Sequence, residues 1–258
     1  MSTVHDDVAQ ASHDAHCAGP PPRRHRNYGR RSGVAVTKTT IGFIGSGHIG
    51  GTVARLSVAA GHSVVLSNSR GPETLKDLVA GLGPRASAAT GAEPAAAGDL
   101  VVVSIPLLAY ASVPAAPLAG QVVMDANNYY VQRDGPIAEL DSGALTSSGL
   151  LQRHLAGAGV VKVFNNIFYK HLLSLARPDA ADRTFLPIAG DDPAARAAVT
   201  AFLDSIGYGA VDGGPLAESW RQEPGTPVYG IPYGPFENEA GTPASETVIR
   251  EALAAARR

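Results

Sequence analysis

The chain has 258 residues, of which 45% are hydrophobic and 17% charged, and its formal net charge is −2 at pH 7. This composition is ordinary for a globular protein, offers no overall basic surface for nucleic acid, and contains no apolar run long enough to cross a bilayer. A single cysteine, Cys17, excludes an internal disulfide framework and is typical of a reducing compartment. We therefore expect a cytoplasmic protein that binds neither nucleic acid nor membrane.

Residues 1–36 differ in composition from the rest of the chain. They are rich in His, Asp, Pro and Arg and have no apolar periodicity, which predicts a disordered tail. A start of translation near Val34 or Val36 would explain the abrupt change. Three residues of this tail could share a metal ion, His13, His16 and Cys17. No rigid second element supplies further ligands, so we predict no metal site.

From residue 40 onward, short β-branched runs alternate with helical stretches, which predicts a mostly parallel sheet. We expect strands at 41–44, 63–66, 85–89, 100–105, 121–124, 160–164, 185–189 and 210–212. Helices are expected at 48–60, 72–82, 148–155, 166–176 and 193–206, with an irregular segment at 106–119, a polar loop at 125–144 and a terminal helix. The pattern predicts an α/β fold with a doubly wound sheet and a small C-terminal addition. The predicted regions are 37–165 and 166–258.

The first predicted strand is followed by Gly45-Ser46-Gly47-His48-Ile49-Gly50, a GxGxxG sequence that opens a helix. In this context the first glycine permits a tight turn, the second lets the backbone approach a pyrophosphate, and the third lets helix and strand pack closely. The N-terminus of the helix presents free N–H groups to phosphate. The sequence favours a Rossmann-type dinucleotide site; a structural turn or a flavin nucleotide is the alternative.

The end of the second strand indicates which dinucleotide is bound. An NAD site would place a carboxylate there for the ribose hydroxyls. Here the residues are Ser67-Asn68-Ser69-Arg70, and no carboxylate follows until Glu73. Because a guanidinium beside small polar groups suits a 2′-phosphate, we predict NADP(H). The alternative is that Arg70 only begins the following loop.

Polar residues follow three further strands at the same edge of the predicted sheet. Ser104, Ile105 and Pro106 lie at the carboxyl end of the fourth strand, Asn127 follows the fifth, and Asn165-Asn166 follow the sixth. Ligands of open α/β sheets bind at this edge, and neutral amides suit the nicotinamide carboxamide or a polar substrate. Asn is also common in turns, so turn chemistry is the alternative.

Convincing acid–base candidates are scarce. Tyr169, Lys170 and His171 are consecutive, so their side chains diverge on a helix. His48 is expected to cover the pyrophosphate, and His62 is expected to be structural. A missing proton donor favours hydride transfer between two cofactors, which depends mainly on stacking and distance.

Taken together, these segments resemble the F420-dependent NADP reductase family. The matching motifs are IGFIGSGHIG at 41–50, SNSRGPE at 67–73, SIP at 104–106, DANNY at 125–129, RDG at 133–135, VKVFNN at 161–166, AGDD at 189–192 and DGGPL at 212–216. The resemblance implies an NADP site at residues 45–49 and 68–70, a C-terminal region that helps to form the deazaflavin pocket, and a homodimer. It also implies that Asn165, Asn166 and Ile167 flank the deazaflavin. Asn165 replaces a His of archaeal members, and the sequence differs from theirs beyond residue 219.

We therefore predict an NADP(H)-dependent oxidoreductase that exchanges hydride with deazaflavin coenzyme F420. Ile105, Pro106 and Ile167 would form apolar walls and Asn165 a polar anchor. One alternative is an NADPH-dependent reductase of an organic C=O, C=N or C=C substrate, such as one of secondary metabolism, which uses Tyr169, His171 or Trp220. Another is a non-enzymatic NADPH-sensing protein.

Overall fold

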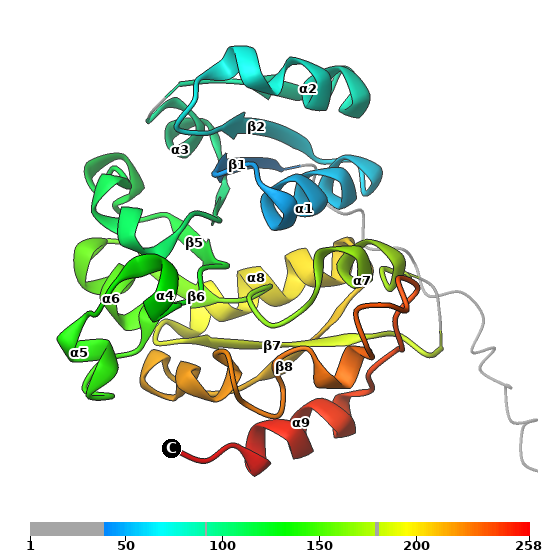
Figure 1. Cartoon of the computed structure of the whole chain (residues 1–258). Coiled ribbons are helices and arrows are strands. Elements are labelled where there is room, and N and C mark those ends of the chain that lie inside the picture. The colour runs from blue at the N-terminus through cyan, green and yellow to red at the C-terminus, as the bar shows by residue number, and fades with distance from the viewer. Residues whose placement is uncertain (1–38, 91, 179–180) are drawn as a thin grey trace, which may run out of the picture. The chain divides into compact units, whose positions relative to one another are not determined.

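The computed structural model describes residues 39–258 except 91, 179 and 180 (Figure 1). Its strands are β1 (Thr40–Ile44), β2 (Ser63–Ser67), β3 (Ala86–Ala88), β4 (Leu100–Val103), β5 (Val122–Asp125), β6 (Gly159–Lys162), β7 (Phe185–Gly190) and β8 (Gly209–Asp212). Its α-helices are α1 (His48–Ala59), α2 (Lys76–Leu82), α3 (Glu93–Ala97), α4 (Val131–Asp134), α5 (Ala138–Asp141), α6 (Ser147–His154), α7 (Tyr169–Ser174), α8 (Pro193–Ser205) and α9 (Glu246–Ala255). Five 3₁₀ helices complete the described part, η1 (Pro72–Leu75), η2 (Leu107–Ser112), η3 (Ala116–Leu118), η4 (Leu216–Gln222) and η5 (Ile231–Tyr233).

The eight strands form one sheet in the order β3-β2-β1-β4-β5-β6-β7-β8. All neighbouring strands are parallel except β6 and β7, which pair antiparallel with Val161 opposite Gly190. The chain leaves β1 toward β3 and then returns to β4 on the other side of β1. This reversal of direction opens a crevice at the carboxyl ends of β1 and β4, where ligands of such sheets bind. The predicted α/β class with a mostly parallel sheet is confirmed.

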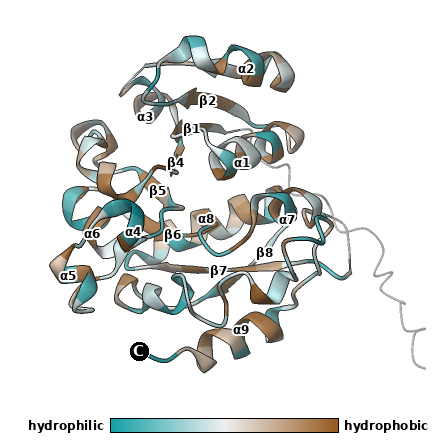
Figure 2. Cartoon of the chain, in the orientation of Figure 1, coloured by the Kyte–Doolittle hydropathy of each residue, from teal (hydrophilic) through white to brown (hydrophobic). Residues whose placement is uncertain are grey.

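Alternate residues of the central strands belong to two different apolar cores. In β4, Val102 joins a core that includes residues of α1 and α8, whereas Val101 and Val103 join a core built with α6, η2 and η3. The same alternation separates Val123 from Met124 in β5. Figure 2 shows the mainly apolar colour of β4 and β7. Both faces are thus buried, which explains the nearly continuous apolar sequences of these strands.

Several boundaries differ from the predictions for local reasons. The strand expected at 160–164 ends at Lys162, because Phe164 has a φ of 66°, which an extended strand does not allow. The helix expected at 166–176 begins only at Tyr169. The strand expected at 100–105 ends at Val103. The polar loop expected at 125–144 contains α4 and α5, whose single turns are too short for periodicity to reveal.

The helix expected at 193–206 begins and ends as the sequence indicates. Asp192 caps it by accepting a hydrogen bond from the Ala194 N–H at 2.8 Å, Pro193 occupies its first turn, and Gly207 follows it with a φ of 95°. His62, expected to be structural, is buried and contacts Thr39 Oγ1 and Ser205 Oγ at 2.9 Å each.

The remaining predictions concern the N-terminal tail, the division into regions, membrane spans and metal sites. The tail at 1–36, with His13, His16 and Cys17, lies outside the described residues. The regions 37–165 and 166–258 remain a prediction, and the sheet continues through β6 and β7 on either side of that boundary. Within the described ranges, no helix has the length and apolarity needed to cross a bilayer, and no cluster of His, Cys, Asp and Glu has the geometry of a metal site.

Candidate functional site

The three glycines of the loop between β1 and α1 have three different environments. Gly45 has a φ of 97°, and a Cβ on it would lie 2.1 Å from the Ser104 carbonyl oxygen. A Cβ on Gly50 would lie 2.3 Å from the Gly45 carbonyl oxygen. A Cβ on Gly47 would meet nothing within 4 Å. The first and third glycines therefore permit close packing, and the second leaves open space beside the N-terminus of α1.

Two cavities adjoin this loop at the carboxyl edge of the sheet, and they share Gly47, Ser104, Ile105 and Pro106. We call them the Arg70 cavity, of about 590 Å³, and the Tyr229 cavity, of about 600 Å³. Both volumes lie within the range of small-molecule sites, roughly 300–1,000 Å³. The two cavities are therefore neighbours along the carboxyl ends of β1 and β4.

The Arg70 cavity is lined by the glycine loop and by the end of β2. Asn68 is held by its neighbours, since its Oδ1 accepts the Arg70 N–H at 2.9 Å and its Nδ2 donates to Thr74 Oγ1 at 2.9 Å. The Arg70 side chain is exposed, and among the residues that the structure describes no carboxylate lines the cavity. The lining comprises Ile44, Gly45, Ser46, Gly47, Ser67, Asn68, Ser69, Arg70, Ala92, Ser104, Ile105, Pro106, Ala109, Ser112 and Pro114.

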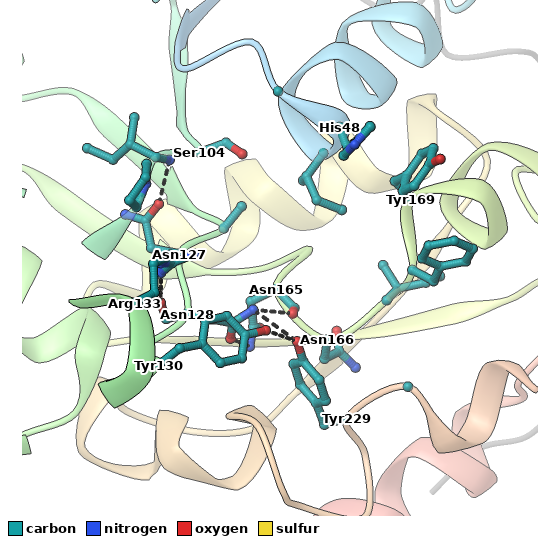
Figure 3. A pocket seen from close by; sticks show the side chains of 18 of the residues that line it. His48, Ser104, Asn127, Asn128, Tyr130, Arg133, Asn165, Asn166, Tyr169 and Tyr229 are labelled. Carbon is teal, nitrogen blue, oxygen red and sulfur yellow. Dashed lines mark hydrogen bonds between the residues drawn. The ribbon is translucent and has the colours of Figure 1, made fainter. Parts of the chain in front are cut away.

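The Tyr229 cavity is lined by more distant parts of the chain (Figure 3). Asn127, Asn165 and Asn166 contribute to its wall, together with apolar, aromatic and hydroxyl side chains. The lining comprises Gly47, His48, Ile49, Ser104, Ile105, Pro106, Ala126, Asn127, Asn128, Tyr130, Arg133, Asn165, Asn166, Ile167, Phe168, Tyr169, Tyr229, Gly230 and Phe236. All the predicted cofactor-binding and substrate-binding residues therefore line one or both cavities.

The three predicted amides are oriented by backbone partners. Asn127 Oδ1 accepts the Ile105 N–H at 2.8 Å, while Asn165 Nδ2 and Asn166 Nδ2 donate to backbone carbonyls at 2.6 and 3.0 Å. Within the described ranges, the buried atoms Asn127 Nδ2, Asn165 Oδ1 and Asn166 Oδ1 have no hydrogen-bond partner. A buried polar group without a partner costs about 1–3 kcal/mol, which a ligand or water that reaches it would recover. Turn formation alone does not explain why these three buried atoms lack a hydrogen-bond partner.

A pair of hydroxyl groups closes another side of this cavity. Tyr130, which precedes α4, and Tyr229, which follows η4 in the chain, are hydrogen-bonded through their hydroxyl oxygens (Figure 3). Burial, and then the hydrogen bond with Tyr130, raise the pKa of Tyr229 well above its ordinary value. Sequence reasoning missed this pair, because 99 positions separate the two residues.

Arg133 and Asp134 support the Tyr130 side of the cavity. Arg133 donates to both carboxylate oxygens of Asp134 at 2.9 and 2.8 Å, and its guanidinium lies 5.0 Å from the centre of the Tyr130 ring. Burial alone would raise the pKa of Asp134. The hydrogen bonds from Arg133 and the Tyr130 N–H, with the guanidinium charge, instead lower that pKa. Asp134 thus remains an ionised anchor for this short helix.

The cluster at Tyr169, Lys170 and His171 diverges as predicted. The Tyr169 ring stacks on His48 with centroids 4.3 Å apart, and both residues line the Tyr229 cavity. Lys170 instead pairs with Glu239, and the buried His171 donates through Nε2 to the Asn238 carbonyl at 2.8 Å. Neither of these residues lines either cavity.

A buried network lies beneath the cavity. Lys162 is fully buried and donates to the Asn127 carbonyl at 3.1 Å, to Ser147 Oγ at 2.8 Å and to Ser148 Oγ at 3.1 Å. Ser148 in turn donates to Asp125 Oδ2 at 2.5 Å. Burial raises the pKa of Asp125, and the nearby Lys162 charge opposes this effect. Lys162 thereby fixes the backbone at Asn127, a role that its position inside a strand did not reveal.

Comparison with known proteins gives a family match for the segment that contains the glycine loop and the end of β2. Residues 40–129 match the model of the family described as NADP oxidoreductase coenzyme F420-dependent. The predicted resemblance is therefore confirmed over this segment, and NADP-dependent oxidoreduction is the activity class of that family. No curated protein matches the sequence.

Solved structures match more of the chain. A hypothetical protein from Sinorhizobium meliloti is 26% identical, with a TM-score of 0.66, and the match covers 81% of this chain and 97% of that one. A protein of Arthrobacter sp. FB24, provisionally named an F420-dependent NADP-reductase, is 24% identical, with a TM-score of 0.59 and coverage of 70% and 87%. An imine reductase from Pseudomonas sp. is 19% identical, with a TM-score of 0.50 and coverage of 70% and 57%. The last two likenesses demonstrate a shared fold.

Proposed function

We propose that this chain, whose residues 40–129 match the F420-dependent NADP oxidoreductase family, exchanges a hydride between NADP(H) and deazaflavin coenzyme F420. The observation that carries the proposal is the pair of adjoining cavities that share Gly47 and the segment Ser104–Pro106. A dinucleotide has two halves, and each half needs a site of different chemistry. The Arg70 cavity suits the phosphate-bearing half, and the Tyr229 cavity suits the nicotinamide half beside a second ring.

The glycine loop has the features that a pyrophosphate requires. No side chain caps the N-terminus of α1, so its first N–H groups can donate hydrogen bonds to a ligand. The open space beside Gly47 lies at the same end of the helix. Helix N-terminal N–H groups and the helix dipole stabilise bound phosphate. His48 lies beside this space and can cover the phosphates.

Arg70 is the residue that would distinguish NADP from NAD. Its exposed guanidinium lines the cavity together with Ser69 and Asn68, and the Asn68 side chain is fixed toward Thr74. A 2′-phosphate gains charge-assisted hydrogen bonds from a guanidinium, whereas a ribose hydroxyl gains much less. We therefore infer a preference for NADP(H).

The Tyr229 cavity supplies walls for hydride transfer. Bound NADPH would contribute the hydride itself. Ile105, Pro106 and Ile167 form apolar surfaces that exclude water, and Asn127 with Asn165 offers amide groups of both hydrogen-bonding types. The aromatic residues Phe168, Tyr169 and Phe236 add flat surfaces suited to a second ring system. A cytoplasmic location and a homodimer remain parts of this proposal.

The proposal is tested by mixing the purified full-length protein with NADPH and oxidised F420 near neutral pH. We expect the visible absorbance of F420 to fall as NADPH is consumed, and we expect NADH to react at least about tenfold more slowly, the size of effect that one charge-assisted contact gives. NADPH binding without loss of F420 absorbance would remove F420 from the account. Binding with no turnover of any acceptor would instead support an NADPH-sensing protein.

The hydroxyl pair Tyr130–Tyr229 favours a second candidate, reduction of an organic carbonyl compound by NADPH. Such a reduction needs a proton for the oxygen as well as a hydride for the carbon, and the cavity contains hydroxyl groups. The test is NADPH consumption with cyclohexanone and acetophenone in place of F420. Turnover of these ketones without turnover of F420 would establish this candidate over the first.

A further inference from the structure

The hydrogen bonds around Tyr229 determine how many hydroxyl protons remain available to the cavity. Asn128 Nδ2 donates to the Asn165 backbone carbonyl at 2.7 Å, and a carbonyl can only accept, so the orientation of the Asn128 amide is fixed. The same Nδ2 lies 3.4 Å from the Tyr229 hydroxyl oxygen. Asn128 therefore acts as a donor toward Tyr229, and the Tyr229 oxygen is the acceptor.

The two hydroxyls share one hydrogen bond, although they carry two protons. Whichever oxygen donates in the Tyr130–Tyr229 bond, the other hydroxyl keeps its proton. Among the described residues, neither hydroxyl has a further partner besides Asn128, which can only donate here. Both tyrosines line the cavity, at an edge of the pocket that also includes Asn165 and Asn166 (Figure 3). One free O–H donor therefore remains available at the cavity wall.

We propose that the Tyr130–Tyr229 pair donates this hydrogen bond, and then its proton, to the acceptor atom that gains an electron pair when hydride is added. The proposal rests on the hydride transfer proposed above and specifies the acceptor class. The acceptor carries a carbonyl group, either isolated or conjugated with the carbon that takes the hydride. The pair is thus a catalytic group that touches the substrate.

The step balances with NADPH as the reductant. Hydride adds to the acceptor carbon, the π bond or conjugated π system breaks, and its electron pair moves to the carbonyl oxygen. An O–H bond of the pair breaks as its proton moves to that oxygen. The phenolate then recovers a proton from water, either directly or through the second hydroxyl. NADPH is oxidised to NADP⁺, and the acceptor gains one hydride and one proton.

The surroundings of the pair suit this role. Arg133 lies over the Tyr130 ring, and its positive charge acts to lower the pKa of Tyr229, which favours a transient phenolate there. Burial raises the pKa of Tyr229, so the hydroxyl stays protonated at neutral pH and transfers its proton only to a strongly basic oxygen. An alkoxide or an enolate-like oxygen formed by hydride addition is such a base.

The test compares Tyr130→Phe, Tyr229→Phe and the double variant with the wild type. Each change keeps the ring and removes the hydroxyl. Steady-state rates are measured with F420, and in parallel with cyclohexanone and acetophenone. Tyr110→Phe is the matched control, because the Tyr110 ring contacts His154 edge-to-face and lines neither cavity. Thermal melting and NADPH titration check that the variants fold and bind cofactor.

With the acceptor that the wild type reduces, we expect the double variant to lose at least about 100-fold in kcat, the lower end of what a positioned proton donor contributes. NADPH affinity and the control should stay within about twofold. We also expect a kcat that is flat from roughly pH 6 to pH 9 in the wild type and falls with rising pH in the double variant, because solvent protons then replace the hydroxyl. A merely structural role would not produce this pH profile.

The outcomes separate the two proposals. Reduction of F420 at the wild-type rate by the double variant would overturn the role of the pair and leave the proposed function intact. Tyrosine-dependent reduction of ketones without reduction of F420 would uphold the pair and overturn F420 as acceptor. No turnover of F420 or of either ketone would overturn the pair together with the hydride transfer.

Discussion

The Arg70 cavity and the Tyr229 cavity share a wall and have similar volumes, yet they are built from different chemical groups. In the Arg70 cavity, Gly47 leaves open space beside the N-terminus of α1, where backbone N–H groups can bind a ligand, and Arg70 is the charged side chain of the lining. Around Tyr229, the surface consists of amide, hydroxyl and aromatic side chains from separate segments. A backbone surface holds a group common to many ligands, such as phosphate, whereas a side-chain surface distinguishes one acceptor from another.

The two cavities also differ in what supports them. The glycine loop is held by close packing against Ser104, so its geometry depends on the absence of Cβ atoms. The Tyr229 cavity rests on the buried polar network around Lys162, so its geometry depends on charges and hydrogen bonds that satisfy one another. Substitutions in the glycine loop should therefore act through steric clashes, and substitutions in the Lys162 network through the loss of charges and hydrogen bonds.

The largest effect is expected from Lys162→Met. Removal of the ammonium group leaves Asp125 buried without its nearby positive charge, and we expect a loss of about 3–5 kcal/mol in the free energy of unfolding. Chemical denaturation measures this loss. The double variant Lys162→Met, Asp125→Asn should recover a large part of it. If the double variant is less stable than the single one by the full cost of Asp125→Asn, the two residues do not interact and this account of the network is wrong.

The next effect separates two glycines of one loop. Gly45→Ala places a Cβ against the Ser104 carbonyl at a positive φ, so we expect a loss of about 2–4 kcal/mol in stability. Gly47→Ala adds a Cβ in open space, so stability should change by less than about 1 kcal/mol.

Stability and NADPH affinity should respond differently in the Gly47→Ala variant. In Gly47→Ala the methyl group enters the space beside α1, and we expect NADPH affinity to fall although the fold is intact. Thermal melting and calorimetric titration of both proteins check this contrast. Equal stability of the two variants, or unchanged NADPH affinity in Gly47→Ala, would contradict the assignment of that space to the pyrophosphate.

Arg70→Gln tests the inferred source of cofactor preference. Loss of a charge-assisted contact costs about 1.5–3 kcal/mol, so we expect NADPH to bind about 10- to 100-fold more weakly and NADH to bind almost unchanged. Arg85→Gln is a suitable control, because Arg85 is exposed and lines neither cavity. A parallel loss of affinity for NADPH and NADH would show that Arg70 does not contact the 2′-phosphate.

The smallest effect concerns the pH dependence of stability. Because burial raises the pKa of Asp125 in the folded protein, the native state binds a proton there more tightly than the unfolded state. This contribution to stability is fully present below the unfolded pKa, about 3.9, and is lost as pH rises through the higher folded pKa. The free energy of unfolding of the wild type, minus that of Asp125→Asn, should therefore fall as pH rises from about 4 toward neutrality. A difference that rises over this range would mean that the Lys162 charge outweighs burial and holds the pKa of Asp125 below its ordinary value.

Much of the Arg70 cavity could be predicted because two short segments of the sequence form much of its lining. Gly45 to Gly50 and Ser67 to Arg70 are short segments in which spacing alone indicates the chemistry. The three amides at Asn127, Asn165 and Asn166 were also predicted, since parallel strands bring their carboxyl ends to one edge.

The hydroxyl pair could not be predicted in this way. Tyr130 lies in a segment expected to be a loop, and Tyr229 lies among glycines and prolines without periodicity. Their contact depends on how the last part of the chain folds back onto the end of β5. Lys162 was missed for a related reason, because a lysine within an apolar strand is normally exposed and only the surrounding serines and Asp125 reveal why it is buried.

Transfer of deuterium from NADPH labelled at nicotinamide C4 tests the central claim most directly. The protein is mixed with the labelled cofactor and oxidised F420 in ordinary water, and the reduced product is analysed by mass spectrometry. The account predicts one deuterium in the reduced F420 when one of the two C4 positions is labelled, and none when the other is labelled, because a fixed cofactor presents one face to the acceptor. Reduced F420 without deuterium from either labelled form would contradict direct hydride transfer from NADPH to F420.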